Sequence, residues 1–432
     1  MIYTGIDVSK SSARCVFLDN EGEKLKAFSV GTDKEGFDKL LASIKELKLN
    51  KDNSLFGIEA TGILWENLFS FLTELDFKVI LLNPYQTKKY REALRFKAKT
   101  DDIDAYVIAG LLRSKDFSSS FIPEDRIQAL RDFTKLRYEL VKDRTNYQRQ
   151  ALSLLTLVFP EYSDTALKNP FGIASLAVLK QFPTAKHIAA TKVKQIEAIV
   201  RSIKGNNFSV DNIQHLIDTA KSSVFSGRAS DARALNLNIL LSQIESFNNS
   251  ITSLDAQIET LLTDDQQNNT PSSNLLDIPG VGPKTVAAML SAVGYNGKSF
   301  HAGSNFIGYI GFFPIIRDSG ETKLKRHIAK TGPKYLRWAL YLDAVSCIKH
   351  NEQFKRIYQI KRSQGKSAKQ ALICVAVKLA HTMLSMLKSG KPYDPKRVFA
   401  CSWFFKDRLF FDIFLYLLLI GLLFLIISQF FN

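Results

Sequence analysis

The sequence predicts an α/β domain with a mixed sheet, followed by all-α domains that make up the larger part of the chain. Three observations support this: strand-like runs follow one another near the N-terminus, strands then alternate with helices, and long stretches of helical spacing come next. The first runs are rich in β-branched residues and are separated by turn-forming residues. The elements expected in the first domain are strands 2–8, 13–18 and 24–30, helix 35–47, strand 55–58, helix 64–75 and strand 78–82.

Two long helical stretches, residues 124–160 and 232–264, are expected to pair antiparallel around a small helical insertion. The apolar residues taken to form the helical stripe of the first stretch are Ile127, Leu130, Leu136 and Leu140. Residues 265–274 have the polar composition of a linker. The predicted parts are an α/β domain over 1–121, a helical coiled coil with its insertion over 122–270, a helical domain over 271–398 and an apolar tail over 399–432.

The charge of the chain points to a polyanionic partner. The formal net charge is +16, and residues 275–395 alone hold 19 Lys and Arg against 6 Asp and Glu. An excess gathered in one segment favours a nucleic-acid-binding face over a generic basic surface, and it fits RNA as well as DNA.

The cysteines and the N-terminus predict a cytoplasmic protein. The four cysteines are far apart, with neither a C-x-x-C pair nor zinc-ligand spacing, so they are expected to be small core residues in a reducing compartment. The opening MIYTGIDVSK lacks the basic flank and apolar run of a signal peptide.

Four acidic residues form the first candidate site. Asp7 lies in the first predicted strand and Glu59 ends the fourth, while Asp101 and Asp104 are three apart at a helix start and share a face. Two-metal phosphodiester chemistry needs three or four such carboxylates around ions about 3.5–4 Å apart. Their hard oxygen ligands select Mg²⁺ or Mn²⁺. Asp101 and Asp104 have an alternative role as first-turn acids favoured by the helix dipole, and Asp102 is expected to face elsewhere.

The string IPGVGPKT, residues 278–285, has the pattern of a helix-hairpin-helix turn. In such a turn Gly280 and Gly282 would let backbone N–H groups approach a DNA phosphate, and Lys284 would add positive charge. A plain joint between two helices is the alternative, because Gly-Val-Gly-Pro suits that equally well.

A third segment, residues 311–340, holds Ser319 in an Asp-Ser-Gly turn. By composition alone a Ser-Gly turn predicts only a turn. The basic residues around it, all able to neutralise a phosphate, are Arg317, Lys323, Lys325, Arg326 and Lys330.

The strings GIDVSK, GIEATG and KTDDIDA, in this order over about 100 residues, resemble those of DEDD-type insertion-sequence transposases, which are relatives of site-specific DNA invertases. The resemblance implies a ribonuclease H-like domain of the Holliday-junction-resolvase kind, with the four acidic residues as metal ligands. It further implies that Ser319 is the nucleophile of a transient covalent link to DNA. Finally, it implies a homo-oligomer, a dimer or tetramer, that acts on paired DNA sites with a structured non-coding guide RNA.

The predicted function is that of a DNA transposase or site-specific recombinase that cuts and rejoins strands with a divalent metal. One alternative is a structure-specific endonuclease that cuts branched DNA with the carboxylates alone. Another is an inactive DNA-binding remnant of a mobile element.

The apolar tail departs from the family pattern. Residues 409–431 contain one charge, Asp412, and are long enough to span a bilayer after a basic flank. A membrane is a partner only if this segment inserts, and a read-through end is the alternative.

Overall fold

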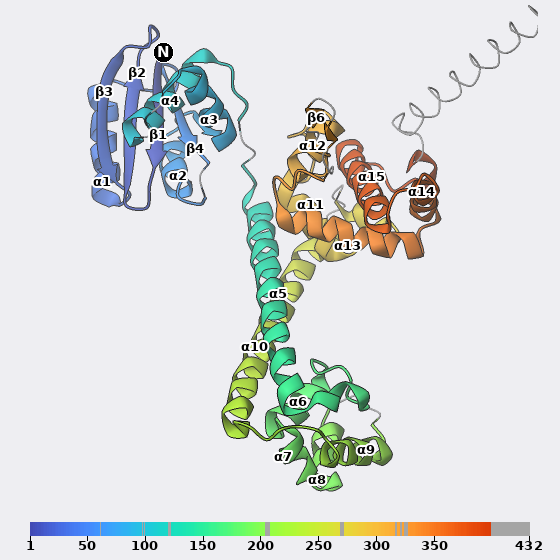
Figure 1. The fold of residues 1–432 in the computed structure, drawn as a ribbon. Helices are drawn as coiled ribbons and strands as arrows, with labels where there is room; N and C mark the ends of the chain where they lie inside the picture. The colour runs from blue at the N-terminus through green and yellow to red at the C-terminus, as the bar shows by residue number, and fades with distance from the viewer. Residues whose placement is uncertain are drawn as a thin grey trace, which may run out of the picture. The chain divides into compact units, whose positions relative to one another are not determined.

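The computed structural model describes residues 1–398 apart from 61, 97, 99, 120–121, 204–207, 268–271, 316–317, 320–321 and 324–326. For residues 265–267, 318–319 and 322–323 it describes the backbone alone. The chain forms two compact units, Met1–Ile122 and the part from Pro123 onward (Figure 1).

The first unit is built on a five-stranded mixed sheet of order β3-β2-β1-β4-β5, which confirms the predicted α/β class. β1, β2 and β3 are antiparallel, whereas β4 and β5 run parallel to β1. The carboxyl ends of β1, β4 and β5 therefore meet at one edge. The strands are β1 (Ile2–Val8), β2 (Ser12–Leu18), β3 (Lys24–Gly31), β4 (Ser54–Glu59) and β5 (Val79–Leu82).

Helices cover both faces of this sheet (Figure 1). One face packs with α1 (Lys34–Glu46) and α2 (Glu66–Glu74) around a buried apolar core. The other face packs with α4 (Asp101–Ser114), and α3 (Pro84–Ala93) lies against α4. The largest buried side chains of the first core include Ile6, Phe17, Leu40, Phe56, Ile58 and Leu72.

Two glycines allow α4 to lie directly on the sheet. Gly5 and Gly57 are partners in the β1–β4 register. A Cβ on Gly5 would lie 2.0 Å from the Ala105 carbonyl oxygen, and one on Gly57 would lie 2.7 Å from Leu112. Because Leu112 also packs against Tyr3, α4 runs antiparallel to β1, and its first turn reaches the carboxyl edge of the sheet.

The second unit begins with two long antiparallel helices, α5 (Asp125–Val158) and α10 (Ser230–Gln267). Polar contacts join these helices. Arg137 pairs with Asp255, and about two turns further along α5 the Arg144 guanidinium donates to Asn248 Oδ1 at 2.8 Å. The small helices between them pack around a core that they share with the end of α5 and the start of α10. They are η1 (Pro160–Asp164), α6 (Ile173–Gln181), α7 (Ala185–Ala189), α8 (Val193–Arg201) and α9 (Val210–Lys221).

Two sequence predictions for this pair were wrong. Leu136 is 52% exposed, because six residues from Leu130 is not a helical repeat; Thr134 is the buried residue of that turn instead. The helix α10 also continues to Gln267, three residues into the segment predicted as a linker, because a polar composition does not by itself exclude a helix.

The remaining elements are mainly helical. They are η2 (Ser273–Asp277), α11 (Pro283–Val293), α12 (Gly303–Ile310), β6 (Asp318–Ser319), β7 (Thr322–Lys323), α13 (Lys334–His350), α14 (Glu352–Ser363), α15 (Ala368–Ser389) and η3 (Pro395–Val398).

In the described part of the chain, α15 alone is long and apolar enough by composition to cross a membrane. More than half of its apolar window is buried inside the protein, as in the core helix of a globular domain. The predicted tail over 399–432 lies outside the described residues. Cys15 and Cys347 are buried, as expected for core residues, whereas Cys374 is only half-buried.

Candidate active site

Asp7 and Glu59 stand side by side at the carboxyl edge of the sheet. The parallel register of β1 and β4 pairs Ile6 with Ile58, so the next residues of the two strands come to the same level. Side chains alternate along a strand, and Gly5 and Gly57, two residues earlier, face α4. Both carboxylates therefore belong to the α4 face, and both are partly buried.

The other two acidic residues come to this edge on the first turn of α4. Thr100 caps the helix, with Oγ1 accepting from the Ile103 N–H at 3.3 Å. Asp101 is one turn before Ala105, the residue that lies over Gly5, and is exposed beyond the end of the sheet. Asp104 follows in the same turn. The fold thus brings all four predicted carboxylates to one end of the domain.

The helix α3 contacts two of these carboxylates. Thr87 Oγ1 donates to Glu59 Oε2 at 2.6 Å, and Arg91 Nη1 donates to Asp104 Oδ1 at 2.6 Å. Neither partner was identified from the sequence, and neither was α3. A local signal did exist, because Asn83 caps α3 by accepting from the Tyr85 N–H and Pro84 occupies the first turn.

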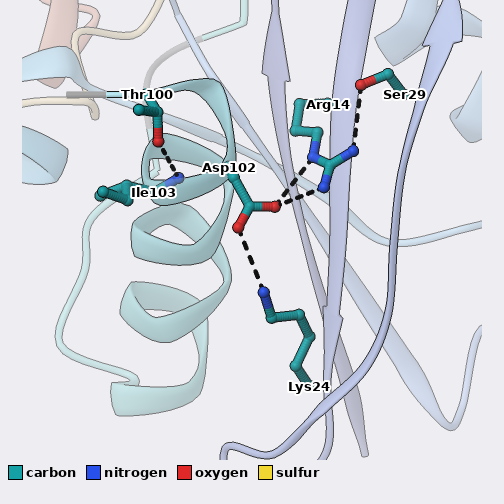
Figure 2. A network of polar contacts seen from close by, with 6 residues as sticks. All are labelled: Arg14, Lys24, Ser29, Thr100, Asp102 and Ile103. Atoms are coloured by element: carbon teal, nitrogen blue, oxygen red, sulfur yellow. Dashed lines mark hydrogen bonds and ion pairs between the residues drawn. The ribbon is translucent and has the colours of Figure 1, made fainter. Parts of the chain in front are cut away.

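Asp102 points toward the sheet, where Arg14 of β2 and Lys24 of β3 pair with it (Figure 2). Its Oδ1 accepts from Arg14 Nε and Nη2 at 3.0 and 2.7 Å, and its Oδ2 accepts from Lys24 Nζ at 3.3 Å. The hydrogen bonds from Arg14 are the main reason that the pKa of Asp102 lies below its usual value. Arg14 also donates to Ser29 Oγ, so this network ties the first turn of α4 to β2 and β3.

The donor set at this edge fits a hard divalent cation in its chemistry, since all four groups are carboxylates. Within the described ranges, no group of three or more His, Cys, Asp or Glu side chains is arranged to hold an ion. Glu59 and Asp104 instead have protein partners on α3, so taking up a cation would require at least Asp104 to rearrange.

The predicted phosphate-binding turn between η2 and α11 is engaged within its own unit. The Gly282 N–H donates to Asp343 Oδ2 at 3.0 Å, and Lys284 Nζ pairs with Asp255 Oδ2 at 2.9 Å. Gly280 has a φ of +96°, and a Cβ there would lie 2.8 Å from the Cys347 backbone. These contacts favour the joint between helices, the alternative left open by the sequence.

The Asp343 carboxyl group at this turn is largely buried on α13. Burial raises its pKa above the ordinary value, and the hydrogen bond from the Gly282 N–H opposes only part of that rise. An acidic side chain therefore occupies the place where the sequence predicted a DNA phosphate.

Ser319 lies in a short two-stranded sheet, opposite Thr322. The arms of this hairpin are joined by Ile315 N–H to His327 O and by Ala329 N–H to Phe313 O, each at 2.9 Å. The side chains of Ser319 and Lys323 lie outside the described residues, as do Arg317, Lys325 and Arg326 altogether. Lys330, at the base of the hairpin, is exposed.

Comparison with known families decides the identity of this arrangement. A family model for a transposase of the DEDD type matches residues 4–160, the region of the four carboxylates. A second, for transposases of the IS116/IS110/IS902 family, matches residues 272–359, which include Ser319. Together the two matches cover more than half of the chain. The chain belongs to this transposase family.

Relatives are similar to the transposase over most of its length. The pilin gene-inverting protein of Moraxella bovis is 25% identical over 91% of this chain and 98% of its own. The insertion element IS116 uncharacterized 44.8 kDa protein of Streptomyces clavuligerus is 25% identical over 91% of this chain and 96% of its own. The mini-circle putative transposase for IS117 of Streptomyces coelicolor is 24% identical over 92% and 97%.

The family gives the transposase its general chemistry. It is a DNA transposase or recombinase, so DNA is its partner. The DEDD domain implies a ribonuclease H-like N-terminal unit, in agreement with the mixed five-stranded sheet. Domains of this type generally depend on a divalent metal.

Proposed function

We propose that this transposase cuts and rejoins DNA strands at specific sites, using a metal centre at the carboxyl edge of the sheet and Ser319 as nucleophile. The observation that carries the proposal is the gathering of four carboxylates at one end of a mixed sheet, in a chain of a transposase family. Packing gives no reason for this, because a core does not call for neighbouring carboxylates.

The proposed metal ligands are Asp7, Glu59, Asp101 and Asp104, holding Mg²⁺ or Mn²⁺. Divalent ions in such a centre supply charge stabilisation for the attacking and leaving oxygens of a phosphodiester. The Arg14–Asp102 network would keep the first turn of α4, with its two ligands, at the sheet edge. The residues proposed to neutralise the DNA phosphate beside Ser319 are Arg317, Lys323, Lys325, Arg326 and Lys330.

In the proposed reaction Ser319 Oγ attacks a DNA phosphorus. A serine–phosphorus ester bond forms, the bond from phosphorus to one deoxyribose oxygen breaks, and the serine proton passes to a base in the site. A hydroxyl of the recipient strand later attacks the same phosphorus and restores the serine. The number of phosphoester bonds is conserved, so no energy source is needed for rejoining.

Several finer parts of the proposal rest on the family resemblance. These are a homo-oligomer acting on paired DNA sites and a structured guide RNA, whereas the proposed cytoplasmic location rests on the scattered cysteines. The word inverting in the name of the Moraxella bovis relative supports a site-specific reaction. If Gly280, Gly282 and Lys284 contact DNA, they do so after releasing Asp343 and Asp255.

The test is to trap protein on DNA. A DNA substrate with a strand that cannot rejoin, incubated with the full chain and Mg²⁺, should give a covalent protein–DNA adduct on a denaturing gel. Ser319→Ala should remove the adduct, whereas Ser363→Ala, an exposed serine on α14, should keep it.

The competing functions give different gels. An endonuclease that uses water yields free ends and no adduct, and Ser319→Ala cuts at a nearly normal rate. An inactive DNA-binding remnant yields no cleavage at any metal concentration. Either result would overturn the serine mechanism.

A further inference from the structure

Two side chains of α3 contact two of the proposed metal ligands, and they differ in charge. Thr87 and Arg91 are four residues apart and therefore lie on the same face of the helix. Thr87 is 4% exposed and its hydroxyl lies 2.6 Å from Glu59 Oε2. The Arg91–Asp104 pair, at 2.6 Å, is 22% and 16% exposed.

The position of α3 is fixed by contacts away from these acids. Tyr90, between the two residues, donates from its hydroxyl to the Gly110 carbonyl on α4 at 3.2 Å. Gly110 has no side chain to displace the Tyr90 ring, whose nearest atom would lie 3.2 Å from a Cβ there. At the start of α3 the Gln86 amide exchanges two hydrogen bonds of 2.9 Å with the Ser118 backbone. The contacts to the acids are therefore built into the domain.

The two contacts have opposite consequences for a cation. A neutral hydroxyl that donates to one oxygen of Glu59 leaves the carboxylate negative and fixes its orientation, as the outer partners of metal ligands do. A guanidinium on Asp104 supplies positive charge at the ligand itself. Like charges in a partly buried site repel, so a divalent ion and Arg91 compete for the same carboxylate.

We propose that Arg91 is a built-in counter-ion of the metal centre. In the metal-free protein it holds Asp104 and relieves the repulsion among the carboxylates gathered at the sheet edge. It gives up Asp104 when the divalent cation arrives, whereas Thr87 keeps Glu59 oriented in both states. Arg91 is thus a positioning residue that sets the metal affinity, and this rests on the proposed function, in which Asp104 is a ligand.

The experiment measures Mn²⁺ binding to the full chain by titration calorimetry, together with thermal unfolding without metal. Arg91→Met should lower the unfolding temperature of the metal-free protein and tighten Mn²⁺ binding, by about tenfold for a pair of this kind. Arg91→Gln keeps a hydrogen-bond donor without the charge and should also tighten binding, whereas Arg91→Lys should stay near wild type.

Thr87→Val and Lys89→Met complete the set. Thr87→Val removes the hydroxyl that donates to Glu59 and also lies 3.1 Å from the Pro84 carbonyl oxygen, and it should weaken Mn²⁺ binding by about 10–100-fold, the usual loss for an outer-partner change. Lys89 is on the same helix but pairs with Glu92 at the surface, so Lys89→Met should leave the affinity unchanged. A merely structural role for Arg91 could not produce tighter binding in both of its neutral variants.

Weaker or unchanged Mn²⁺ binding in both Arg91→Met and Arg91→Gln would overturn the proposal that Arg91 is a counter-ion. If Arg91→Met folds only with Mn²⁺ present, the proposal is supported, since the metal then replaces the guanidinium. Asp7→Asn separates this question from the proposed function. If wild type and Asp7→Asn take up Mn²⁺ equally, the metal centre itself is absent from the sheet edge. The proposal that Arg91 is its counter-ion is then wrong as well.

Discussion

The carboxylate edge of the sheet and the glycine turn before α11 were both predicted to act on DNA, and in both the polar groups have partners within the chain. At the sheet edge, Glu59 and Asp104 are held by the helix α3. At the turn, Gly282 and Lys284 are held by Asp343 and Asp255.

The two sites differ in whether packing within the chain accounts for their residue types. The register of β1 and β4 places Asp7 and Glu59 at one level, although an aliphatic pair would serve the packing of that edge better. The turn needs no partner outside the protein. The positive φ of Gly280 and its close approach to Cys347 account for that glycine, and Asp343 satisfies the Gly282 N–H. A functional assignment is therefore stronger where packing cannot account for the residue types.

The largest expected effect is on the carboxylate side of this comparison. Asp7→Ala or Glu59→Ala should reduce DNA strand cleavage by about a thousandfold or more, because ligand loss removes several kcal/mol of transition-state stabilisation. DNA affinity should stay close to wild type, because basic contacts dominate it. Cleavage rates from single-turnover assays and a binding isotherm measure the two quantities.

Asp38→Ala is the matched control, since Asp38 is an exposed acid on the helix α1 of the same unit. Wild-type cleavage by either site variant, or by wild-type protein in excess chelator, would show that the gathered carboxylates have another role.

A smaller effect concerns stability on the helical side. Asp255 accepts from Arg137 of α5 and Lys284 of α11 and so joins three helices. Burial alone would raise its pKa, but these two partners outweigh burial, and the net pKa is lowered. Asp255→Asn should reduce the free energy of unfolding at pH 7 by about 1–3 kcal/mol, because it leaves the largely buried Arg137 guanidinium, as well as the exposed Lys284 ammonium, without its partner.

The sign of the pH dependence follows from the lowered pKa. The contribution of Asp255 is present above the ordinary carboxyl value of about 3.9 and is lost as the pH falls through the lower folded value. Urea unfolding of wild type and Asp255→Asn should therefore differ at pH 7 and converge in acid. Asp132→Asn, on the exposed side of α5, should match wild type throughout. A constant difference at every pH would indicate a packing defect.

The strands and the acidic residues of the first unit could be predicted from the sequence, because alternation of apolar residues and the spacing of the motifs are local properties. The helix α3 could not be predicted in this way. Its sequence PYQTKKYREA has one buried residue, Thr87, so it has no apolar periodicity. Thr87 and Arg91 belong to no motif, and their role appears only when α3 is placed beside the sheet edge.

In the helical unit the motif could be recognised from the sequence, but its partners could not. The IPGVGPKT string is conspicuous in the sequence, but its partners Asp255 and Asp343 are distant in the chain and carry no local signal. The pattern of Gly and Pro could identify a turn, while the choice between a phosphate and an internal carboxylate depended on long-range packing. The prediction that Leu136 belongs to the apolar stripe was wrong for a simpler reason, because its spacing from Leu130 is not helical.

The smallest expected effect tests the turn directly through the salt dependence of DNA binding. A lysine that neutralises one phosphate contributes about 0.9 to the slope of log affinity against log salt. Because Asp255 already neutralises Lys284, we expect Lys284→Ala in the full chain to change the slope by much less than that, whereas Lys330→Ala, at the exposed base of the hairpin, should lower it by about the full amount. In an Asp255→Asn background Lys284 has lost this partner and can reach a phosphate, so adding Lys284→Ala should then lower the slope by about one.

A full reduction by Lys284→Ala in the otherwise unchanged protein would mean that DNA takes Lys284 from Asp255. The turn would then be a phosphate-binding element like the one the sequence predicted, and the contrast with the sheet edge would disappear.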